Sequence, residues 1–177
     1  MVDLLSRPTA PTPAELLPSV PVFSVSSSDF VDGGQLPFRL SVAGGSVSPQ
    51  LSWSGFPAET KSFAVTCYDP DAPTGCGWWH WLLIDIPVET TVLDRGIGES
   101  DLLVDGAAFH LRNDGGTWAY NGANPPAGDR PHRYIFTVHA LDVDTLSLDE
   151  DASAAVAGFN LTFHGIARAS ITGTFQQ

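Results

Sequence analysis

The stretch Cys67–Pro87, "CYDPDAPTGCGWWHWLLIDIP", decides how the chain folds, because it contains the end of one strand, a turn and the start of the next strand. Residues 62–69 predict a strand that ends where Pro70 and Pro73 follow, since proline lacks the N–H that a sheet needs. A short glycine-containing loop then leads to an apolar strand that begins at His80. The sequence therefore predicts an antiparallel hairpin.

The rest of the chain predicts an all-β domain, because short apolar segments are separated by Gly, Pro, Asn and Asp. Residues 132–142 are apolar on both faces, as expected of a central strand that is covered on both sides. A helix is expected over residues 149–160, with an N-cap among Asp149–Asp151 and a stop at Gly158, and a second short helix over 160–167. The expected strands cover residues 21–27, 36–42, 50–55, 62–69, 80–87, 132–142 and 169–175.

The length of 177 residues suits one domain, which needs no metal or disulfide for stability. Residues 1–21 are rich in Pro, Ala and Ser and indicate an extended arm that wraps the domain or reaches a neighbouring molecule, which leaves residues 22–177 as the domain. The N-terminus lacks a basic head followed by an apolar core, and no apolar run approaches the roughly twenty residues that span a bilayer. A soluble, cytoplasmic protein is expected.

The net charge and the cysteine spacing limit which ligands and partners the protein is expected to have. The net charge of −12 repels polyphosphate backbones and anionic lipids, so we expect neither nucleic acid binding nor stable membrane association. Cys67 and Cys76 do not have the spacing of a zinc site. Two idle thiols in a reducing compartment are favoured over a disulfide.

Two aspartates and a histidine form the first candidate site. The turn presents Asp69 and Asp71 at a strand end, where aspartate also commonly caps a turn through backbone amides. The hairpin returns His80 to the neighbourhood of Asp69, and a carboxylate beside an imidazole fixes its tautomer and favours its protonated form. The neighbouring Trp78, Trp79 and Trp81 either form a pocket wall or fill the core.

The second candidate segment is residues 113–141, whose long loop is rich in Gly, Asn and Pro. Pro125 and Pro126 stiffen this loop, and His132 begins the strand that follows, as His80 does. The two segments converge at one rim of a β-sandwich if their strands are neighbours. His110, His139 and His164 lack this setting and are expected to be packing or surface histidines.

These segments resemble the phosphatidylethanolamine-binding protein family, also called Raf kinase inhibitor proteins, and especially its bacterial branch. The resemblance covers residues 20–177 and is carried by "DPDAPTG" (69–75), "HW" (80–81), "YNGANPPAG" (120–128) and "HRYIFTVHALD" (132–142). It implies an antiparallel β-sandwich with Greek-key connections, a large central sheet, a smaller second sheet, and one or two short helices near the C-terminus.

The resemblance also implies a small anion-binding pocket. Its members in this sequence would be Asp69, Asp71, Trp78, His80, Pro125, Pro126, His132 and Tyr134. The segment "TGCGWW" is shorter than in the animal proteins, so Trp78 stands in for the aromatic that closes their pocket. The chain also lacks their C-terminal helical extension, which argues against kinase regulation.

We therefore expect a non-enzymatic protein without a cofactor that binds a small anionic or zwitterionic ligand, such as phosphate or phosphoethanolamine. In this scheme one aspartate orients His80, and the other faces a cationic part of the ligand. A hydrolase or metal-dependent enzyme that uses the Asp and His side chains is one alternative, although no GxSxG or HExxH motif occurs. Inhibition of a partner protease or kinase is another. The resemblance to bacterial members implies a homodimer.

Overall fold

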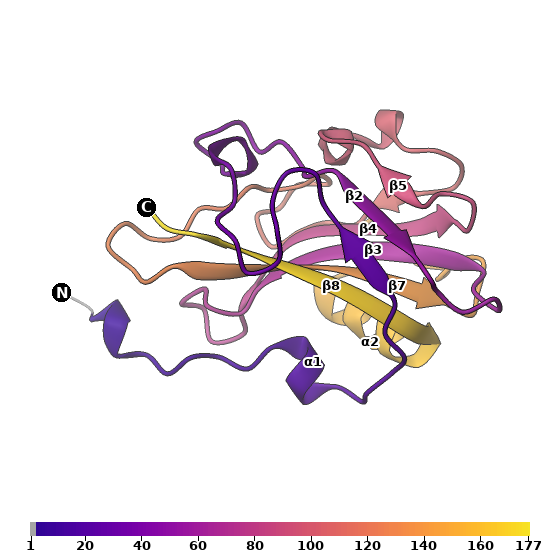
Figure 1. Cartoon of the computed structure of the whole chain (residues 1–177), viewed down its shortest axis with the longest axis horizontal. Coiled ribbons are helices and arrows are strands. Elements are labelled where there is room, and N and C mark those ends of the chain that lie inside the picture. The colour runs from indigo at the N-terminus through magenta and orange to yellow at the C-terminus, as the bar shows by residue number, and fades with distance from the viewer. Residues whose placement is uncertain (1–2) are drawn as a thin grey trace.

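A five-stranded antiparallel sheet forms the centre of the computed structural model, which describes residues 3–177 (Figure 1). The predicted hairpin supplies two of its strands, and the long connection after β6 returns the chain to lie beside β3. The order β7-β3-β4-β6 is therefore a Greek key. The five strands, in spatial order, are β6 (Phe109–His110), β4 (Trp78–Pro87), β3 (Ser62–Asp69), β7 (His132–Leu141) and β8 (Gly165–Phe175).

A smaller antiparallel sheet covers one face of the large one. It contains β1 (Ser24–Ser26), β2 (Leu51–Ser54) and β5 (Val92–Leu93) in that order. The main core lies between the two sheets, where Trp53 of β2 packs edge-on against Phe63 of β3 with their ring centroids 5.4 Å apart. The prediction of a mainly-β sandwich with a large and a small sheet is confirmed.

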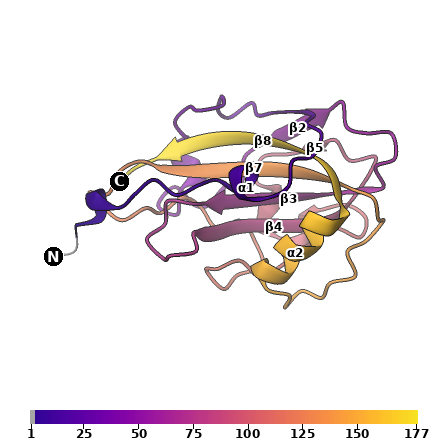
Figure 2. The same ribbon diagram turned by 90° about the horizontal axis from the view of Figure 1, so that it is seen from below.

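The other face of the large sheet is covered by helix α2 (Ala154–His164) and by the arm, which contains α1 (Pro13–Leu16) (Figure 2). A second apolar cluster lies here, in which Leu82 and Ile84 of β4 pack with Ala157 and Leu161 of α2. The central strands are thus buried on both faces, which explains why their sequences are apolar at most positions.

Four short 3₁₀ helices complete the described secondary structure: η1 (Leu4–Ser6), η2 (Phe38–Leu40), η3 (Ile97–Glu99) and η4 (Asp101–Leu103). The prediction of a strand over residues 36–42 is wrong, because η2 occupies this segment. The N–H of Leu40 donates to the carbonyl of Pro37, so the chain forms local bonds here in place of a ladder. The apolar residues Leu36, Phe38, Leu40 and Val42 alternate in the sequence as in a strand, but Leu40 is buried while Phe38 is exposed, so they do not share one face.

Helix α2 also differs from the prediction. Its N-cap is Ser153, whose hydroxyl accepts from the N–H of Val156, and not one of the residues Asp149–Asp151. The helix continues through Gly158 to His164, because a glycine inside a helix costs only about 1 kcal/mol relative to alanine. No separate helix forms over residues 160–167, since β8 begins at Gly165.

The arm lies against its own domain in the part that the structure describes. Arg7 donates to the Asp71 carbonyl and to the Asp129 carboxylate, and Arg133 donates to the Ala10 carbonyl. At the other end of the arm, the N–H of Arg168 donates to the carbonyl of Pro21. The division into an arm (1–21) and a domain (22–177) remains a prediction. Within residues 3–177, no helix is both long and apolar enough to cross a membrane.

Candidate functional site

The end of β3, the start of β4 and the start of β7 meet at one rim of the large sheet, together with the loop that precedes β7. β3 pairs with β4 on one side and with β7 on the other, so this neighbourhood follows from the sheet order. A cavity of about 240 Å³ lies at this rim. Six of the eight predicted site residues line it: Asp69, Trp78, His80, Pro126, His132 and Tyr134.

His132 is the centre of a buried chain of charged groups. Its Nδ1 lies 2.7 Å from Oδ2 of Asp69, and its Nε2 lies 3.0 Å from Oδ2 of Asp129. Burial lowers the pKa of His132, but the hydrogen bonds to the two carboxylates outweigh this and raise it above its ordinary value. With a carboxylate on each nitrogen, the ring is best satisfied as a doubly protonated imidazolium.

Asp129 extends this chain to the arm. Arg7 donates to its Oδ2 at 2.8 Å, and the Arg130 N–H donates to its Oδ1 at 2.8 Å. Burial acts to raise the pKa of Asp129, but the hydrogen bonds from His132, Arg7 and the Arg130 N–H lower it to about 2. The sequence analysis missed Asp129, although its position three residues before His132 was a signal that could have identified it.

The expected partners of the two predicted aspartates are wrong. Asp69 does not orient His80, because its carboxylate accepts from His132 and from the N–H groups of Asp71 and Ala72. Asp71 does not face the cavity. Its carboxylate accepts three hydrogen bonds from Arg133, two from the guanidinium at 2.8 and 2.9 Å and one from the backbone N–H at 3.0 Å. Burial raises the pKa of Asp71, but Arg133 outweighs burial and lowers it.

His80 is held by a backbone carbonyl. Its Nδ1 lies 2.8 Å from the carbonyl oxygen of Asn121, so this nitrogen donates and Nε2 is left as an acceptor in the neutral ring. The side chain is buried, and burial lowers its pKa. His80 therefore differs from His132 in charge, although both lie near the start of a strand at the same rim.

Tyr134 packs edge-on against His80, with ring centroids 5.1 Å apart. Its hydroxyl is fully buried and has no hydrogen-bond partner among the described residues, which is costly unless something else occupies the cavity. Burial raises the pKa of Tyr134 far above its ordinary value, so the hydroxyl keeps its proton and is available as a donor.

The remaining predictions concern residues at the edge of the site. Pro125 is buried beside the cavity and does not line it, so Pro126 forms this part of the wall. Further lining residues that the sequence analysis did not find include Val42, Thr74, Asn121 and Asn124, which come from loops without a recognisable pattern. Trp81 is fully buried in the core, and Trp79 lies on the opposite face of the sheet.

The other histidines and the cysteines lie elsewhere. His110 is buried against Asp101, with 2.5 Å between Nδ1 and Oδ1, and His164 pairs with Asp142 at the surface. His139 lines a second cavity, described below. Both cysteines are free thiols, as the sequence predicts. The described residues contain no group of three or more His, Cys, Asp or Glu side chains placed to hold a metal ion.

A protein-family model matches the segments that form this rim. The family model described as phosphatidylethanolamine-binding protein matches residues 26–176, which include β3, β4, β7 and the loop that carries Asn121 and Asp129. The chain belongs to the phosphatidylethanolamine-binding protein family. The resemblance on which the sequence analysis relied is thereby confirmed.

Similar proteins of this family come from Escherichia coli (strain K12). The chain is 49% identical over 154 residues to the UPF0098 protein YbhB, covering 84% of this chain and 97% of that protein. It is 44% identical over 160 residues to the UPF0098 protein YbcL, covering 87% of each. The crystal structure of YbcL, described as a new member of the mammalian PEBP family, superposes with a TM-score of 0.85 and covers 88% of this chain and 98% of that one.

Proposed function

We propose that the protein binds a small anionic or zwitterionic ligand in the rim cavity and acts as a binding protein without catalysing a reaction. The observation that carries the proposal is the buried hydroxyl of Tyr134, a residue that lines the cavity, because the hydroxyl proton has no acceptor among the described residues. A ligand oxygen would satisfy this donor. Membership of the phosphatidylethanolamine-binding protein family supports a binding role.

The charges around the cavity determine how an anion would be recognised. Asp69, Asp71 and Asp129 are matched by Arg7, Arg133 and protonated His132, so these groups cancel one another. No carboxylate is left to face an ammonium group in the way we first expected, and the ligand would be held by hydrogen bonds. Among the predicted site residues, the Tyr134 hydroxyl and, once it is protonated, His80 Nε2 can donate such bonds to its anionic part.

His80 makes the proposed binding depend on pH. In the unliganded protein Nε2 is an acceptor, because the neutral ring donates through Nδ1 to Asn121. An anion requires a donor at Nε2, so binding must be accompanied by protonation of His80. Since burial lowers the pKa of His80, we expect anion affinity to rise as the pH falls below neutrality.

Calorimetric titration with sulfate and with phosphoethanolamine tests the proposal. Sulfate keeps its charge between about pH 5 and 8, so any pH dependence of its binding comes from the protein. Tyr134→Phe removes the hydroxyl alone and should weaken sulfate binding about tenfold or more, the size expected for one hydrogen bond to a charged group. His80→Asn keeps a donor near the position of Nδ1 and should abolish the pH dependence.

A variant outside the cavity provides the control. Arg112→Gln changes an exposed arginine that lines neither this cavity nor the one on the opposite face of the sheet, and should bind sulfate as the parent does. If both Tyr134→Phe and His80→Asn, folded by thermal melting, bind sulfate and phosphoethanolamine as tightly as the parent, the rim cavity is not the anion site. Tighter binding of phosphoethanolamine than of sulfate would favour a zwitterionic ligand.

The enzymatic alternatives have less support. The carboxylates and His132 are bonded to one another and to arginines, which leaves His80 and Tyr134 as the free polar groups from the predicted set. A regulatory or inhibitory role towards a protease or kinase remains part of the proposal, to be tested by a specific pulldown partner that Tyr134→Phe fails to retain.

Cytoplasmic location and a homodimer also remain proposals. Cell fractionation tests the location. Sedimentation velocity at micromolar concentration tests the dimer, and a sedimentation coefficient that matches the monomer would overturn it.

A further inference from the structure

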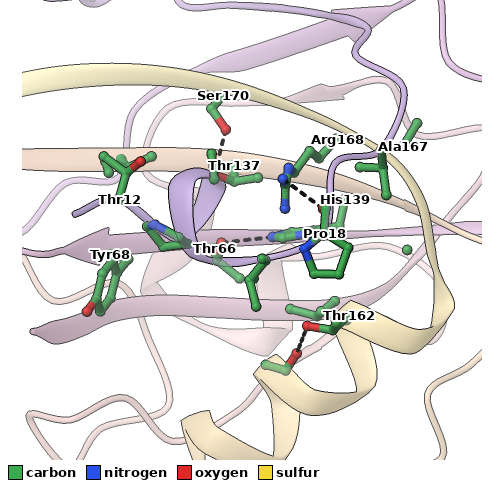
Figure 3. A pocket seen from close by; sticks show the side chains of 18 of the residues that line it. Thr12, Pro18, Thr66, Tyr68, Thr137, His139, Thr162, Ala167, Arg168 and Ser170 are labelled. Carbon is green, nitrogen blue, oxygen red and sulfur yellow. Dashed lines mark hydrogen bonds between the residues drawn. The ribbon is translucent and has the colours of Figure 1, made fainter. Parts of the chain in front are cut away.

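A second cavity lies on the other face of the large sheet, beneath the arm. Its volume is about 200 Å³, and its floor is formed by outward-facing side chains of the central strands, including Thr66 of β3 and Thr137 and His139 of β7 (Figure 3). Helix α2 forms one wall through Gly158 and Leu161, while the arm forms the roof. This cavity is separate from the rim cavity, with which it shares no lining residue.

The roof is attached at its two ends. On one side, Arg130 and Arg133 donate to the carbonyls of Pro8 and Ala10, and on the other the guanidinium of Arg168 donates to the carbonyl of Pro18. Residues 11–17, which include α1, make no hydrogen bond to the rest of the chain among those described, and bond internally through Thr12 and Glu15. The middle of the arm can therefore move away from the cavity while its ends stay in place.

The cavity contains one unbalanced positive charge. Four of the eight basic residues, Arg7, Arg39, Arg95 and Arg133, are each paired with an aspartate, whereas Lys61, Arg112, Arg130 and Arg168 make no ion pair among the described residues. Of these four unpaired residues, Arg168 is the one that lines the cavity. Arg168 lies with His139 and Pro18 at one end of the cavity, and Thr12 and Tyr68 lie at the other (Figure 3).

His139 does not add a second charge. Burial lowers the pKa of His139 to about 4, with a further contribution from Arg168, so the ring is neutral at physiological pH. Its Nε2 lies 3.2 Å from the hydroxyl of Thr66. The rest of the wall is largely apolar, with Leu17, Ile135 and Trp79 among its members. The cavity thus combines one cationic end with an apolar body.

We infer that this cavity binds a small amphipathic carboxylate, with the carboxylate on Arg168, the apolar part under α1, and the arm acting as a lid. The planar guanidinium of arginine suits a carboxylate, and a charge-assisted bond is strongest where water is excluded. The volume sets the ligand size. Since an apolar cavity of roughly 150 Å³ holds benzene, about 200 Å³ accommodates about eight non-hydrogen atoms, the size of hexanoate.

Titration of the ¹⁵N-labelled full chain with hexanoate, followed by NMR, tests the inference. We expect saturable shifts of amide signals from Thr12 and residues 14–17 of the arm and from Gly158 and Thr162 of α2. Hexanamide, which has the same size and shape without the charge, should bind about tenfold more weakly or worse. Arg168→Gln should bind the two compounds equally, because it removes the charge that distinguishes them.

A cavity-filling variant tests the location. A Cβ added at Gly158 meets no atom within 4 Å, so Gly158→Leu has room for its side chain beside the cavity and should abolish hexanoate binding. Ala155→Leu adds the same side chain at an exposed position of α2 and should bind as the parent does. Tyr134→Phe, in the rim cavity, should also leave hexanoate binding unchanged, so this test and that of the rim cavity can fail independently.

Three results would each overturn the inference. The first is the absence of saturable shifts with hexanoate in the parent protein. The second is undiminished binding by folded Gly158→Leu. The third is a preference for hexanoate over hexanamide that survives Arg168→Gln.

Discussion

The two ends of β7 carry histidines in opposite electrostatic surroundings. His132, at the start of the strand, lies between the carboxylates of Asp69 and Asp129, and its pKa is raised. His139, near the end, lies beside Arg168 under the arm, and its pKa is lowered to about 4. One strand thus holds an imidazolium at the rim cavity and a neutral imidazole at the arm cavity.

This difference shows that position in a strand does not determine the role of a histidine. Burial alone lowers the pKa of both, and the sign of the net shift depends on which charges lie within hydrogen-bond reach. At the rim, three acidic and three basic groups cancel, which leaves neutral donors and acceptors to face the cavity. Under the arm, one cation remains without an acidic partner.

The largest effect that would test the comparison is expected at His132. His132→Leu leaves the buried carboxylates of Asp69 and Asp129 without their shared partner, which should lower the free energy of unfolding by about 3–5 kcal/mol. Urea unfolding at neutral pH measures this. His164→Leu, at the exposed pair with Asp142, is the matched control and should cost less than about 1 kcal/mol. Equal costs would show that the buried chain has no special role.

The stability difference between the parent and His132→Leu should also change with pH in a defined direction. Because the pKa of His132 is raised in the folded state, its stabilisation is fully present below its unfolded pKa of about 6.5 and is lost as the pH rises through the folded value. The difference in stability between the parent and His132→Leu should therefore shrink as the pH is raised from about 6 to about 9. A difference that grows over this range would contradict the charge assigned to His132.

A smaller effect of the opposite sign is expected at His139. Its pKa is lowered on folding, so the unfolded chain takes up a proton below about pH 6.5 that the folded protein resists, and stability falls towards about pH 4. His139→Gln should lessen this acid-induced loss, by at most about 3 kcal/mol, in urea unfolding at pH 7 and pH 4.5. Equal acid-induced losses of stability in the parent and in His139→Gln would show that folding does not lower the pKa of His139.

The smallest effect is expected at Arg7, which connects the rim to the arm. Arg7→Gln removes the partly exposed ion pair with Asp129, and should lower stability by about 1 kcal/mol. Hydrogen exchange of residues 12–17 should become faster, because one attachment of the arm is lost. Arg112→Gln, which removes a cation over the Trp118 ring away from the arm, is the control. Unchanged exchange in Arg7→Gln would show that other bonds hold the arm.

The sequence allowed the central fold to be predicted because its long strands are buried on both faces and are bounded by proline and glycine. The hairpin of β3 and β4 and the strand β7 were found for this reason. Two-residue strands such as β5 and β6 contain too few residues for any periodicity, and they were missed. The segment 36–42 alternated like a strand, but its backbone bonds locally after Pro37.

The sequence by itself determined the family, the large antiparallel sheet and most of the residues that reach the rim, since these depend on apolar patterning and on motifs contiguous in the chain. Only the tertiary structure decided which charged side chains pair with one another. It paired Asp69 with His132 in place of His80, turned Asp71 towards Arg133, and left Arg168 unpaired beneath the arm. Charged groups act over a few ångströms, and the neighbours that set their protonation come from distant parts of the chain, which no local pattern encodes.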